Sequence, residues 1–223
     1  MDARFKEFSN DSQANELAGN GAFDFFHAFW ANEIDYQRFY PTLPDAQALA
    51  NVRSALHIPG KPRQAYDIRR RIEPKDPEHR WNVVLVSIES LSASFLEHFG
   101  NAGALTPNLD KLADEGLLFT QLYATGTRTV RGLEALTLSV PPTPGNSIVK
   151  RPDNGDLYSL GSVFSDHGYR SLYVYGGYSY FDNMQAFYTG NGYHVADRTM
   201  LAASDIHFQN IWGVCDEDLF TLA

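Results

Sequence analysis

The stretch WNVVLVSIES, residues 81–90, decides the fold class, because an apolar run of strand length ends there abruptly in a carboxylate. Val83 to Ile88 carry apolar side chains on both alternating faces, which is typical of a strand buried between helix layers in a parallel sheet. Open sheets of this kind place their ligand sites at the carboxyl ends of the strands. We therefore expect Glu89 at the edge of the sheet where the chemistry takes place.

A helix and a second strand are expected directly afterwards. Thr106 can cap the helix with its side chain, Pro107 suits the first helical position, and Gly116 can end the helix in the left-handed conformation. The apolar residues 117–124 then read as a strand. The order strand, helix, strand is typical of an α/β fold.

The polar loop TGTRTVRG, residues 125–132, follows the second strand and brings a threonine, Thr129, to the same edge as Glu89. Residues 132–140 are expected to form a helix whose amino end lies beside Thr129. Free amides at such an end can help to hold a phosphate. Pro141 is expected to stop this helix.

The rest of the carboxyl-terminal part adds a third strand. Arg170 to Tyr175 form the expected buried strand, and residues 176–180 form its exit loop at the same edge. Core positions are expected for three aromatic residues, Phe187, Tyr188 and Tyr193. Ordinary surface or core roles are expected for the histidines His98, His194 and His207.

The first 80 residues differ from this pattern. Residues 22–30 are aromatic-rich and expected to be helical, followed by residues 32–36, and residues 45–56 have helical apolar spacing. We favour a helix packed on the domain over one on a membrane surface, because acidic residues interrupt it. Residues 57–80 contain four prolines and many charges, which indicates a linker. The predicted organisation is a helical and linker segment over 1–80 and a catalytic domain over 81–223.

Composition limits the function classes. With 223 residues, 43% of them hydrophobic, the chain can bury one core of moderate size. The net charge of −9 argues against a nucleic-acid partner. One cysteine, Cys215, excludes an intrachain disulfide. No apolar run approaches the ~20 residues that span a bilayer, and no signal peptide is visible at Met1.

The runs TPNLDKLADEGLLFTQLYATG and TGTRTVRGLEAL, residues 106–126 and 125–136, resemble the sulfatase and alkaline-phosphatase superfamily. The second run is similar to its phosphoglycerol-transferase branch, the relatives of lipoteichoic acid synthase, and the likeness extends with gaps from Asn82 to Phe220. The resemblance implies an α/β fold of the alkaline-phosphatase type. Its mixed, mainly parallel sheet would have helices on both faces and be incomplete at the C-terminus.

The resemblance also implies the chemistry. Sulfatases proper carry a cysteine or serine in a C/S-x-P-x-R frame, whereas Thr129 is followed here by Val130 and Arg131. The transferase branch uses an unmodified threonine, so Thr129 is the expected nucleophile. Glu89 and Thr129 are the expected ligands of Mn²⁺, with Mg²⁺ as the alternative, because carboxylate and hydroxyl oxygens favour hard ions. Arg128 and Arg131 flank the nucleophile and can neutralise phosphoryl charge, although either can instead face solvent.

Substrate contacts follow from the same comparison. Tyr175 and Asp182, with Met184, match the region that contacts glycerol phosphate in lipoteichoic acid synthases, but with different residue types. The implied substrates are a phosphatidylglycerol-type lipid and a glycan or glycerol acceptor. Family members work at the cell membrane with an extracytoplasmic, periplasmic catalytic domain, and we expect the same location here.

One part of the family's metal site is not found in the sequence. Its shell is completed by an Asp-His pair far downstream, and the dipeptide Asp166-His167 sits instead at an expected helix end. We therefore expect a truncated catalytic domain that is catalytically silent and only marginally stable by itself and binds manganese weakly. The alternatives are a sulfatase-like hydrolase of phosphodiesters or sulfuric esters, and a non-catalytic remnant or interaction module.

Overall fold

The structure is a computed structural model that describes residues 6, 8–30, 41–73, 75–143 and 145–223. The chain divides into two compact units, residues 1–87 and 88–223. Each unit is described by itself below.

Two helices of the first unit follow the expected sequence signals, and a third was not expected. Among the residues that the structure describes, the expected ones are α2 (Gly21–Trp30) and α4 (Asp45–Ala55), and the other is α1 (Ser12–Leu17). Asp11 accepts a hydrogen bond from the amide of Gln13 at 2.9 Å, and Asn20 accepts one from the amide of Ala22 at 3.1 Å. These side chains satisfy first-turn donors at the two helix starts. The helices expected over 22–30 and 45–56 are confirmed, whereas residues 32–36 lie outside the described part.

Residues 57–80 contain no helix or strand among those that the structure describes. The first part of this segment nevertheless wraps around one buried side chain of α4. Arg53 donates hydrogen bonds to the carbonyl oxygens of Asp67 at 2.5 Å and Gly60 at 2.9 Å. Arg70 donates to the carbonyl oxygen of Leu56 at 2.8 Å, so this part of the segment is anchored to the end of α4.

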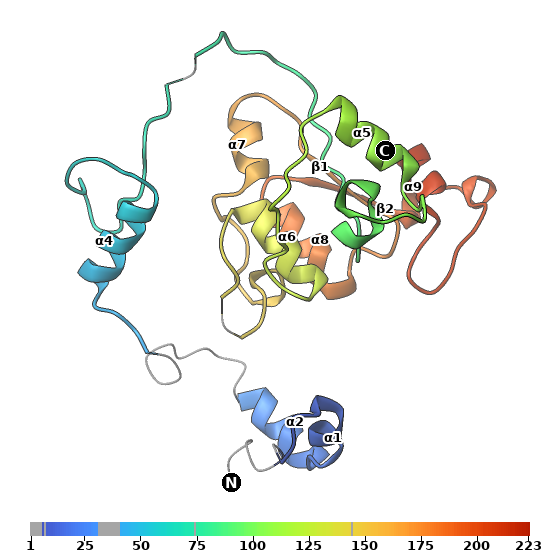
Figure 1. Ribbon diagram of the computed structural model, residues 1–223, viewed down its shortest axis with the longest axis horizontal. Coiled ribbons are helices and arrows are strands. Elements are labelled where there is room, and N and C mark those ends of the chain that lie inside the picture. The colour runs from blue at the N-terminus through green and yellow to red at the C-terminus, as the bar shows by residue number, and fades with distance from the viewer. Residues whose placement is uncertain (1–5, 7, 31–40, 74, 144) are drawn as a thin grey trace. The chain divides into compact units, whose positions relative to one another are not determined.

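The second unit contains most of the regular structure (Figure 1). Its elements are η2 (Ala93–Phe95), η3 (Glu97–Phe99), α5 (Pro107–Glu115), α6 (Thr129–Leu138), η4 (Ile148–Lys150), α7 (Leu160–Asp166), β1 (Leu172–Tyr175), η5 (Phe181–Asn183), α8 (Met184–Gly190), β2 (His194–Asp197), η6 (Arg198–Met200), η7 (Ala203–Asp205) and α9 (Asp216–Leu222). Strands β1 and β2 pair in parallel, with Leu172 opposite His194 and Tyr175 opposite Asp197.

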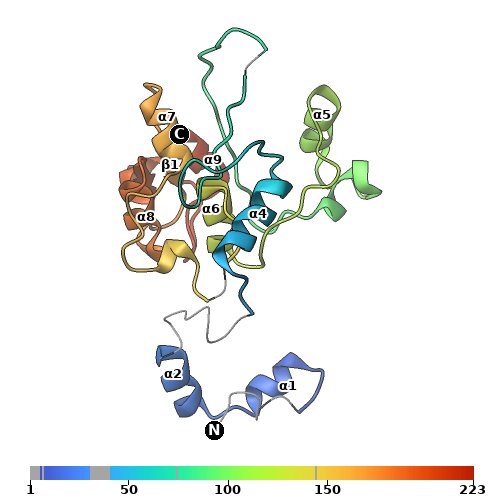
Figure 2. The same ribbon diagram turned by 90° about the vertical axis from the view of Figure 1, so that its left-hand side faces the viewer.

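The core lies where α6, η4 and α8 meet the two-stranded sheet (Figure 2). Its buried members are Val130, Leu133, Val149, Met184, Phe187 and Tyr188. Tyr173 of β1 stacks on Tyr188 with ring centroids 3.6 Å apart, which joins the sheet to α8. The core assignments of Phe187 and Tyr188 are confirmed, and Tyr193 packs against the same cluster.

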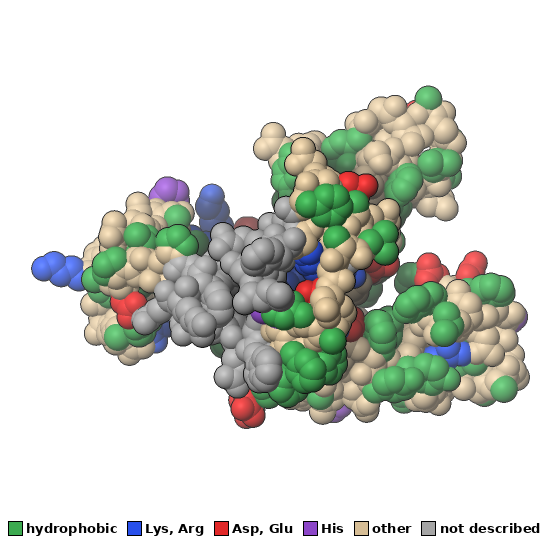
Figure 3. Space-filling model, turned by 90° about the horizontal axis from the view of Figure 1, so that it is seen from below, with side chains coloured by type: hydrophobic (Ala, Val, Ile, Leu, Met, Phe, Trp, Pro, Cys, Tyr) green, Lys and Arg blue, Asp and Glu red, His purple; other side chains and the backbone are tan. Residues whose placement is uncertain are grey.

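The expected large sheet is not formed. Residues 83–88 and 117–124 have no strand assignment, and all of their side chains except the half-buried Leu118 are exposed; Val84 is 83% exposed and Leu117 is 81% exposed. Hydrophobic side chains are accordingly visible on the surface in Figure 3. A strand is stable only when neighbouring strands take its backbone hydrogen bonds, and local sequence cannot supply that partner. The described sheet is the parallel pair β1 and β2. β1 confirms the expected third strand over Leu172–Tyr175, but the strand is exposed at Leu172 and half-buried beyond it rather than buried.

Both ends of α5 and the start of α6 also differ from expectation. The Thr106 hydroxyl lies 3.1 Å from the carbonyl oxygen of Phe95 and 3.0 Å from Asp110 Oδ2, and it accepts no hydrogen bond from a first-turn amide of α5. Gly116 has φ −123°, which is extended rather than left-handed. The helix expected over 132–140 begins earlier, at Thr129, and ends with Ser139 in the left-handed conformation at φ 55°, before Pro141.

Candidate active site

The two residues expected to carry the chemistry lie in direct contact. The Thr129 hydroxyl donates a hydrogen bond to Glu89 Oε2 at 2.8 Å. Ser90 lies 3.4 Å from the other carboxylate oxygen of Glu89 and turns the backbone with φ 57°. Thr129 and Glu89 are both exposed, so a bound substrate can reach them.

Thr129 is the first residue of α6, and Arg128 precedes it in extended conformation. The loop before them folds back closely on the helix. A Cβ at Gly126 would lie 2.8 Å from Cβ of Arg131, a contact that only glycine avoids. The helix start therefore presents the hydroxyl next to the first-turn amides of α6, and the exposed Arg128 lies beside it.

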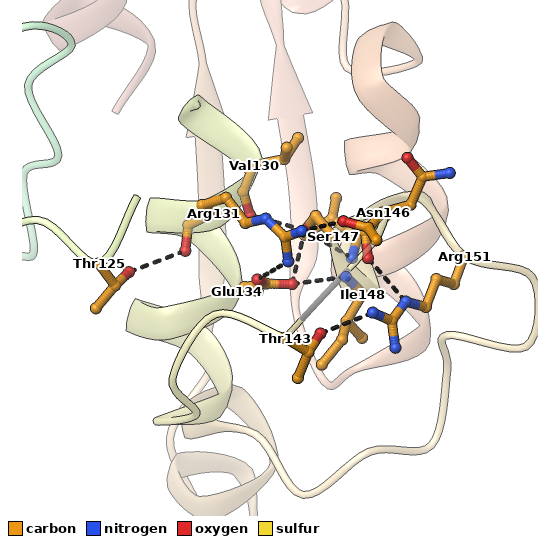
Figure 4. A network of polar contacts seen from close by, with 11 residues as sticks. Thr125, Val130, Arg131, Glu134, Thr143, Asn146, Ser147, Ile148 and Arg151 are labelled. Atoms are coloured by element: carbon orange, nitrogen blue, oxygen red, sulfur yellow. Dashed lines mark hydrogen bonds and ion pairs between the residues drawn. The ribbon is translucent and has the colours of Figure 1, made fainter. Parts of the chain in front are cut away.

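Arg131 turns away from this edge into a buried network (Figure 4). Its Nη1 donates to Glu134 Oε1 at 2.8 Å, and its second Nη donates to the carbonyl oxygen of Gly145. Glu134 is fully buried. The ion pair compensates the buried charge, so Arg131 holds the fold of the site rather than facing solvent.

The other oxygen of Glu134 fixes the segment that follows α6. It accepts from Ser147 Oγ at 2.8 Å and from the amide of Ile148 at 2.6 Å. Ser147 Oγ also lies 2.9 Å from the carbonyl oxygen of Val130, the residue after the expected nucleophile. Glu134 was missed by the sequence reasoning, although a carboxylate inside the apolar run Leu133 to Leu138, three residues after an arginine, is a usable signal.

The residues expected to contact substrate lie at the exit of β1. Asp182 of η5 has φ 52°, Asn183 has φ 62°, and Lys150 Nζ of η4 lies 2.5 Å from Asp182 Oδ1. The pKa of Tyr175 is raised, first by burial and then by the negative charges of Asp182 and Glu89. The negative charges of Asp182 and Glu89 thus both disfavour ionisation of the Tyr175 hydroxyl.

Lys150 was missed by the sequence reasoning, because no local sequence signal relates it to Asp182, which lies 32 positions later.

Asp197, at the end of β2, holds this exit loop. Its carboxylate accepts from the amide and hydroxyl of Ser179 at 2.9 and 2.6 Å, and from the amide and hydroxyl of Thr199 at 2.9 and 2.6 Å. Burial raises the pKa of Asp197, but the hydrogen bonds from Ser179 and Thr199 outweigh it and lower that pKa to about 2.

The histidines have partners away from Thr129. His98 pairs with Asp110 and Asp114, each at 3.1 Å, and His207 Nδ1 lies 2.6 Å from the buried Asp218. Asp166 and His167 form the carboxyl end of α7, as expected.

In the part of the chain that the structure describes, no three His, Cys, Asp or Glu residues come together in a group that could hold a metal ion. Glu89 and Thr129 remain the candidate ligands. Their carboxylate and hydroxyl oxygens are donors of the kind that hard divalent cations prefer, so the pair fits two positions of a Mn²⁺ or Mg²⁺ shell.

The sequence profile of the Sulfatase family matches residues 81–223, more than half of the chain. The chain belongs to the sulfatase family. A protein in the alkaline phosphatase superfamily from Vibrio parahaemolyticus is similar in structure to this sulfatase-family chain. The likeness has a TM-score of 0.50 and 42% sequence identity, and it covers 52% of this chain. It covers 29% of the Vibrio protein, so this chain spans less than a third of that relative.

Family membership and the structural likeness agree with the expected superfamily. Among the helices of the described residues, none has the length and apolar character needed to cross a membrane.

Proposed function

We propose that this protein is a metal-dependent phosphoglycerol transferase that acts on phosphatidylglycerol through Thr129. The observation that carries the proposal is the 2.8 Å hydrogen bond from the Thr129 hydroxyl to Glu89. A threonine hydroxyl is a poor nucleophile unless a base or a cation activates it, and Glu89 is placed to take its proton. Threonine at the position where sulfatases proper carry cysteine or serine supports transfer through an unmodified side chain.

The proposed reaction has two displacement steps. Thr129 Oγ attacks the phosphorus of the lipid phosphodiester as its proton moves to Glu89. The bond from phosphorus to the diacylglycerol oxygen breaks, and that oxygen takes up a proton as diacylglycerol leaves. A glycan or glycerol hydroxyl then attacks the phosphorus of the glycerophospho-threonine and gives up its proton to solvent. The bond from phosphorus to Thr129 Oγ breaks, and Thr129 Oγ takes back the proton held by Glu89.

Charge neutralisation is the main contribution that a protein makes to such phosphoryl transfer. Arg128 is exposed beside the nucleophile, and Thr129 is the first residue of α6, so the positive end of the helix dipole lies at the same place. Glu89 and Thr129 would hold Mn²⁺, with Mg²⁺ as the alternative. When bound, such a cation lowers the pKa of a coordinated hydroxyl and offsets phosphoryl charge.

Substrate identity and location rest on the resemblance to the transferase branch. Tyr175 and Asp182 lie at the exit of β1, where that branch contacts glycerol phosphate, and the acceptor would be a glycan or glycerol. The reaction would take place at the extracytoplasmic, periplasmic side of the cell membrane, where phosphatidylglycerol and such acceptors meet.

A second candidate is a sulfatase-like hydrolase in which water accepts the group from Thr129. The match to the Sulfatase family supports it, because that family includes hydrolases. Both candidates need the same nucleophile and differ in the acceptor. A non-catalytic remnant or interaction module, in contrast, needs no Thr129 hydroxyl.

The test joins residues 81–223 to the part of the Vibrio parahaemolyticus relative that the likeness does not cover. With Mn²⁺ and a fluorescent phosphatidylglycerol, we expect diacylglycerol release and a glycerophosphoryl adduct on Thr129, detected by mass spectrometry. Thr129→Ala should abolish both, whereas the matched control Thr127→Ala should retain most activity. Turnover that survives Thr129→Ala would refute the proposal. Release of free glycerol phosphate without transfer to added glycerol would favour the hydrolase.

A further inference from the structure

We infer that residues 57–73, the basic loop, form a docking surface for an anionic lipid bilayer. The basic loop contains five Lys or Arg and two Asp or Glu, a net charge of +3, in a chain whose net charge is −9. An anionic bilayer therefore attracts this segment and repels the acidic remainder of the chain. The surface involves no residue of the candidate active site and does not depend on the proposed reaction.

The basic loop is folded around a buried pair of side chains. Arg53 of α4 is 8% exposed and donates hydrogen bonds to the carbonyl oxygens of Asp67 at 2.5 Å and Gly60 at 2.9 Å. Asp67 is also buried, and its carboxylate accepts from the amide of Arg63 at 3.1 Å and from Arg69 Nε at 3.0 Å. Both halves of the loop are thus bonded to the same pair, which fixes the backbone that carries the exposed side chains.

Further contacts attach the basic loop to both ends of α4. The Tyr66 hydroxyl donates to Asp45 Oδ2, at the start of the helix, at 2.5 Å. Tyr66 has φ 57°, a left-handed conformation that residues other than glycine rarely adopt and that the surrounding contacts must hold. Arg70 donates to the carbonyl oxygen of Leu56, at the end of the helix, at 2.8 Å. The helix and the loop therefore form one platform.

Four cations of this platform are accessible to phosphate groups. The side chains of Arg69 and Arg71 are 71% and 87% exposed, and each uses Nε to contact a carboxylate. Within the described residues their Nη groups make no hydrogen bond, so they can bind phosphate oxygens. Lys61 and Arg63 are exposed as well, and their side chains form no ion pair with any residue that the structure describes. Basic side chains project from the body that contains α4 in Figure 3.

Exposed apolar side chains lie beside these cations in the sequence. Ile68 and Ile72 flank the run of three arginines and are 48% and 73% exposed, and Tyr66 is 68% exposed. A peripheral membrane site needs both kinds of side chain, cations for the headgroups and apolar groups for the boundary with the acyl chains. A soluble polyanion would bind the cations and gain nothing from the isoleucines. The combination therefore favours a lipid surface as the partner.

The test measures co-sedimentation of the full 223-residue chain with vesicles of phosphatidylcholine alone and of phosphatidylcholine mixed with phosphatidylserine. Phosphatidylserine supplies negative charge without being the proposed substrate. The wild type should bind the mixed vesicles at least about tenfold more tightly than the neutral ones, and added salt should weaken that binding because exposed charges are screened. Equal binding to both kinds of vesicle would overturn the inference.

The contribution of charge is tested by Lys61→Gln combined with Arg71→Gln. This variant should bind the mixed vesicles about tenfold more weakly or worse, because each cation near the surface contributes to the attraction. The matched control, Lys111→Gln with Arg170→Gln, removes two exposed cations of the second unit and should bind as the wild type does. Circular dichroism checks that each variant is folded. Equal losses in the variant and its control would show that the basic loop is not the docking surface.

The contribution of apolar insertion is tested by Ile72→Ser. This variant should bind the mixed vesicles about fivefold more weakly, because less apolar surface is buried, and should leave any binding to heparin, a soluble polyanion, unchanged. Its control is Ile211→Ser, which changes an isoleucine of the second unit that is 86% exposed and should keep wild-type vesicle binding. If Ile72→Ser bound the mixed vesicles as tightly as the wild type, the loop would recognise charge alone. A soluble polyanion would then fit it as well, and the assignment to a bilayer would be refuted.

Discussion

The Thr129 hydroxyl and the Glu89 carboxylate lie 2.8 Å apart although 40 residues separate them in the sequence. One residue begins α6, and the other precedes the left-handed Ser90. The start of α6 and the turn at Ser90 thus bring Thr129 Oγ1 and Glu89 Oε2 into contact. The pair therefore depends both on the start of α6 and on the turn at Ser90.

Glu89→Gln should weaken Mn²⁺ binding by the full chain by at least about tenfold, because a neutral amide replaces a charged oxygen ligand. Titration followed by electron paramagnetic resonance measures free Mn²⁺ directly. Glu115→Gln changes an exposed carboxylate of α5 and serves as the control. Equal Mn²⁺ affinity in wild type and Glu89→Gln would remove Glu89 from the metal site.

Glu134→Ala should lower the free energy of unfolding by about 3 kcal/mol or more, because it leaves Arg131 buried without its carboxylate. The variant also removes the acceptor of Ser147 and Ile148. Urea denaturation measures the loss. Glu115→Ala breaks an exposed pair and should change stability by about 0.5 kcal/mol at most. A loss for Glu134→Ala as small as that of the control would contradict the anchoring role.

Signals that act within one turn of the chain predicted the helices well. Apolar spacing predicted α4, proline at the first helical position predicted the start of α5, and the end of α7 at Asp166 was located correctly. The backbone hydrogen bonds of a helix form within the helix itself, so its own residues carry most of the information that specifies it. The predicted contacts at the helix ends were less accurate. The Thr106 hydroxyl, for example, is bonded to the carbonyl oxygen of Phe95 and to Asp110 instead of capping α5.

Features that join distant parts of the chain were predicted less well. The apolar run 83–88 was expected to be a buried strand, but strand formation depends on a neighbour that the run does not specify. β2 at His194–Asp197 was not expected at all and forms because β1 pairs with it. In the candidate site, family motifs located Glu89 and Thr129, whereas Lys150 depends on a contact with Asp182 that no motif contains.

His98 should titrate above the ordinary value of about 6.5 for histidine. Its pKa is raised first by the hydrogen bond to Asp110, and Asp114 raises it further. NMR titration of the imidazole should show this shift in the wild type. Asp110→Asn should remove most of it, and Asp114→Asn should remove less, because Asp110 contributes the larger effect. A His98 pKa that Asp110→Asn leaves unchanged would rule out this cause.

The contact between His98 of η3 and Asp110 of α5 predicts the pH range in which the two helices stabilise each other. A raised pKa of His98 means that its contribution to stability is present below pH ~6.5 and is lost as pH rises through the folded-state pKa. Burial raises the pKa of Asp110, but hydrogen bonds from His98 and Thr106 outweigh it and lower that pKa. The contribution of Asp110 is therefore lost as pH falls below its ordinary range near 3.8. The contact between His98 and Asp110 should therefore contribute most to stability between pH 3.8 and pH ~6.5.

Asp197→Asn should destabilise the exit loop of β1 by about 2 kcal/mol, because an amide nitrogen replaces one of the oxygens that accept from Ser179 and Thr199. The lowered pKa of Asp197 means that its contribution is present above pH 3.8 and is lost as pH falls toward about 2. Urea denaturation at pH 7 and pH 3 should therefore show a smaller acid-induced loss in Asp197→Asn than in the wild type. Asp166→Asn, at the exposed end of α7, should keep the wild-type difference. If both variants keep it, the carboxylate of Asp197 does not stabilise the loop that carries Asp182 into the site.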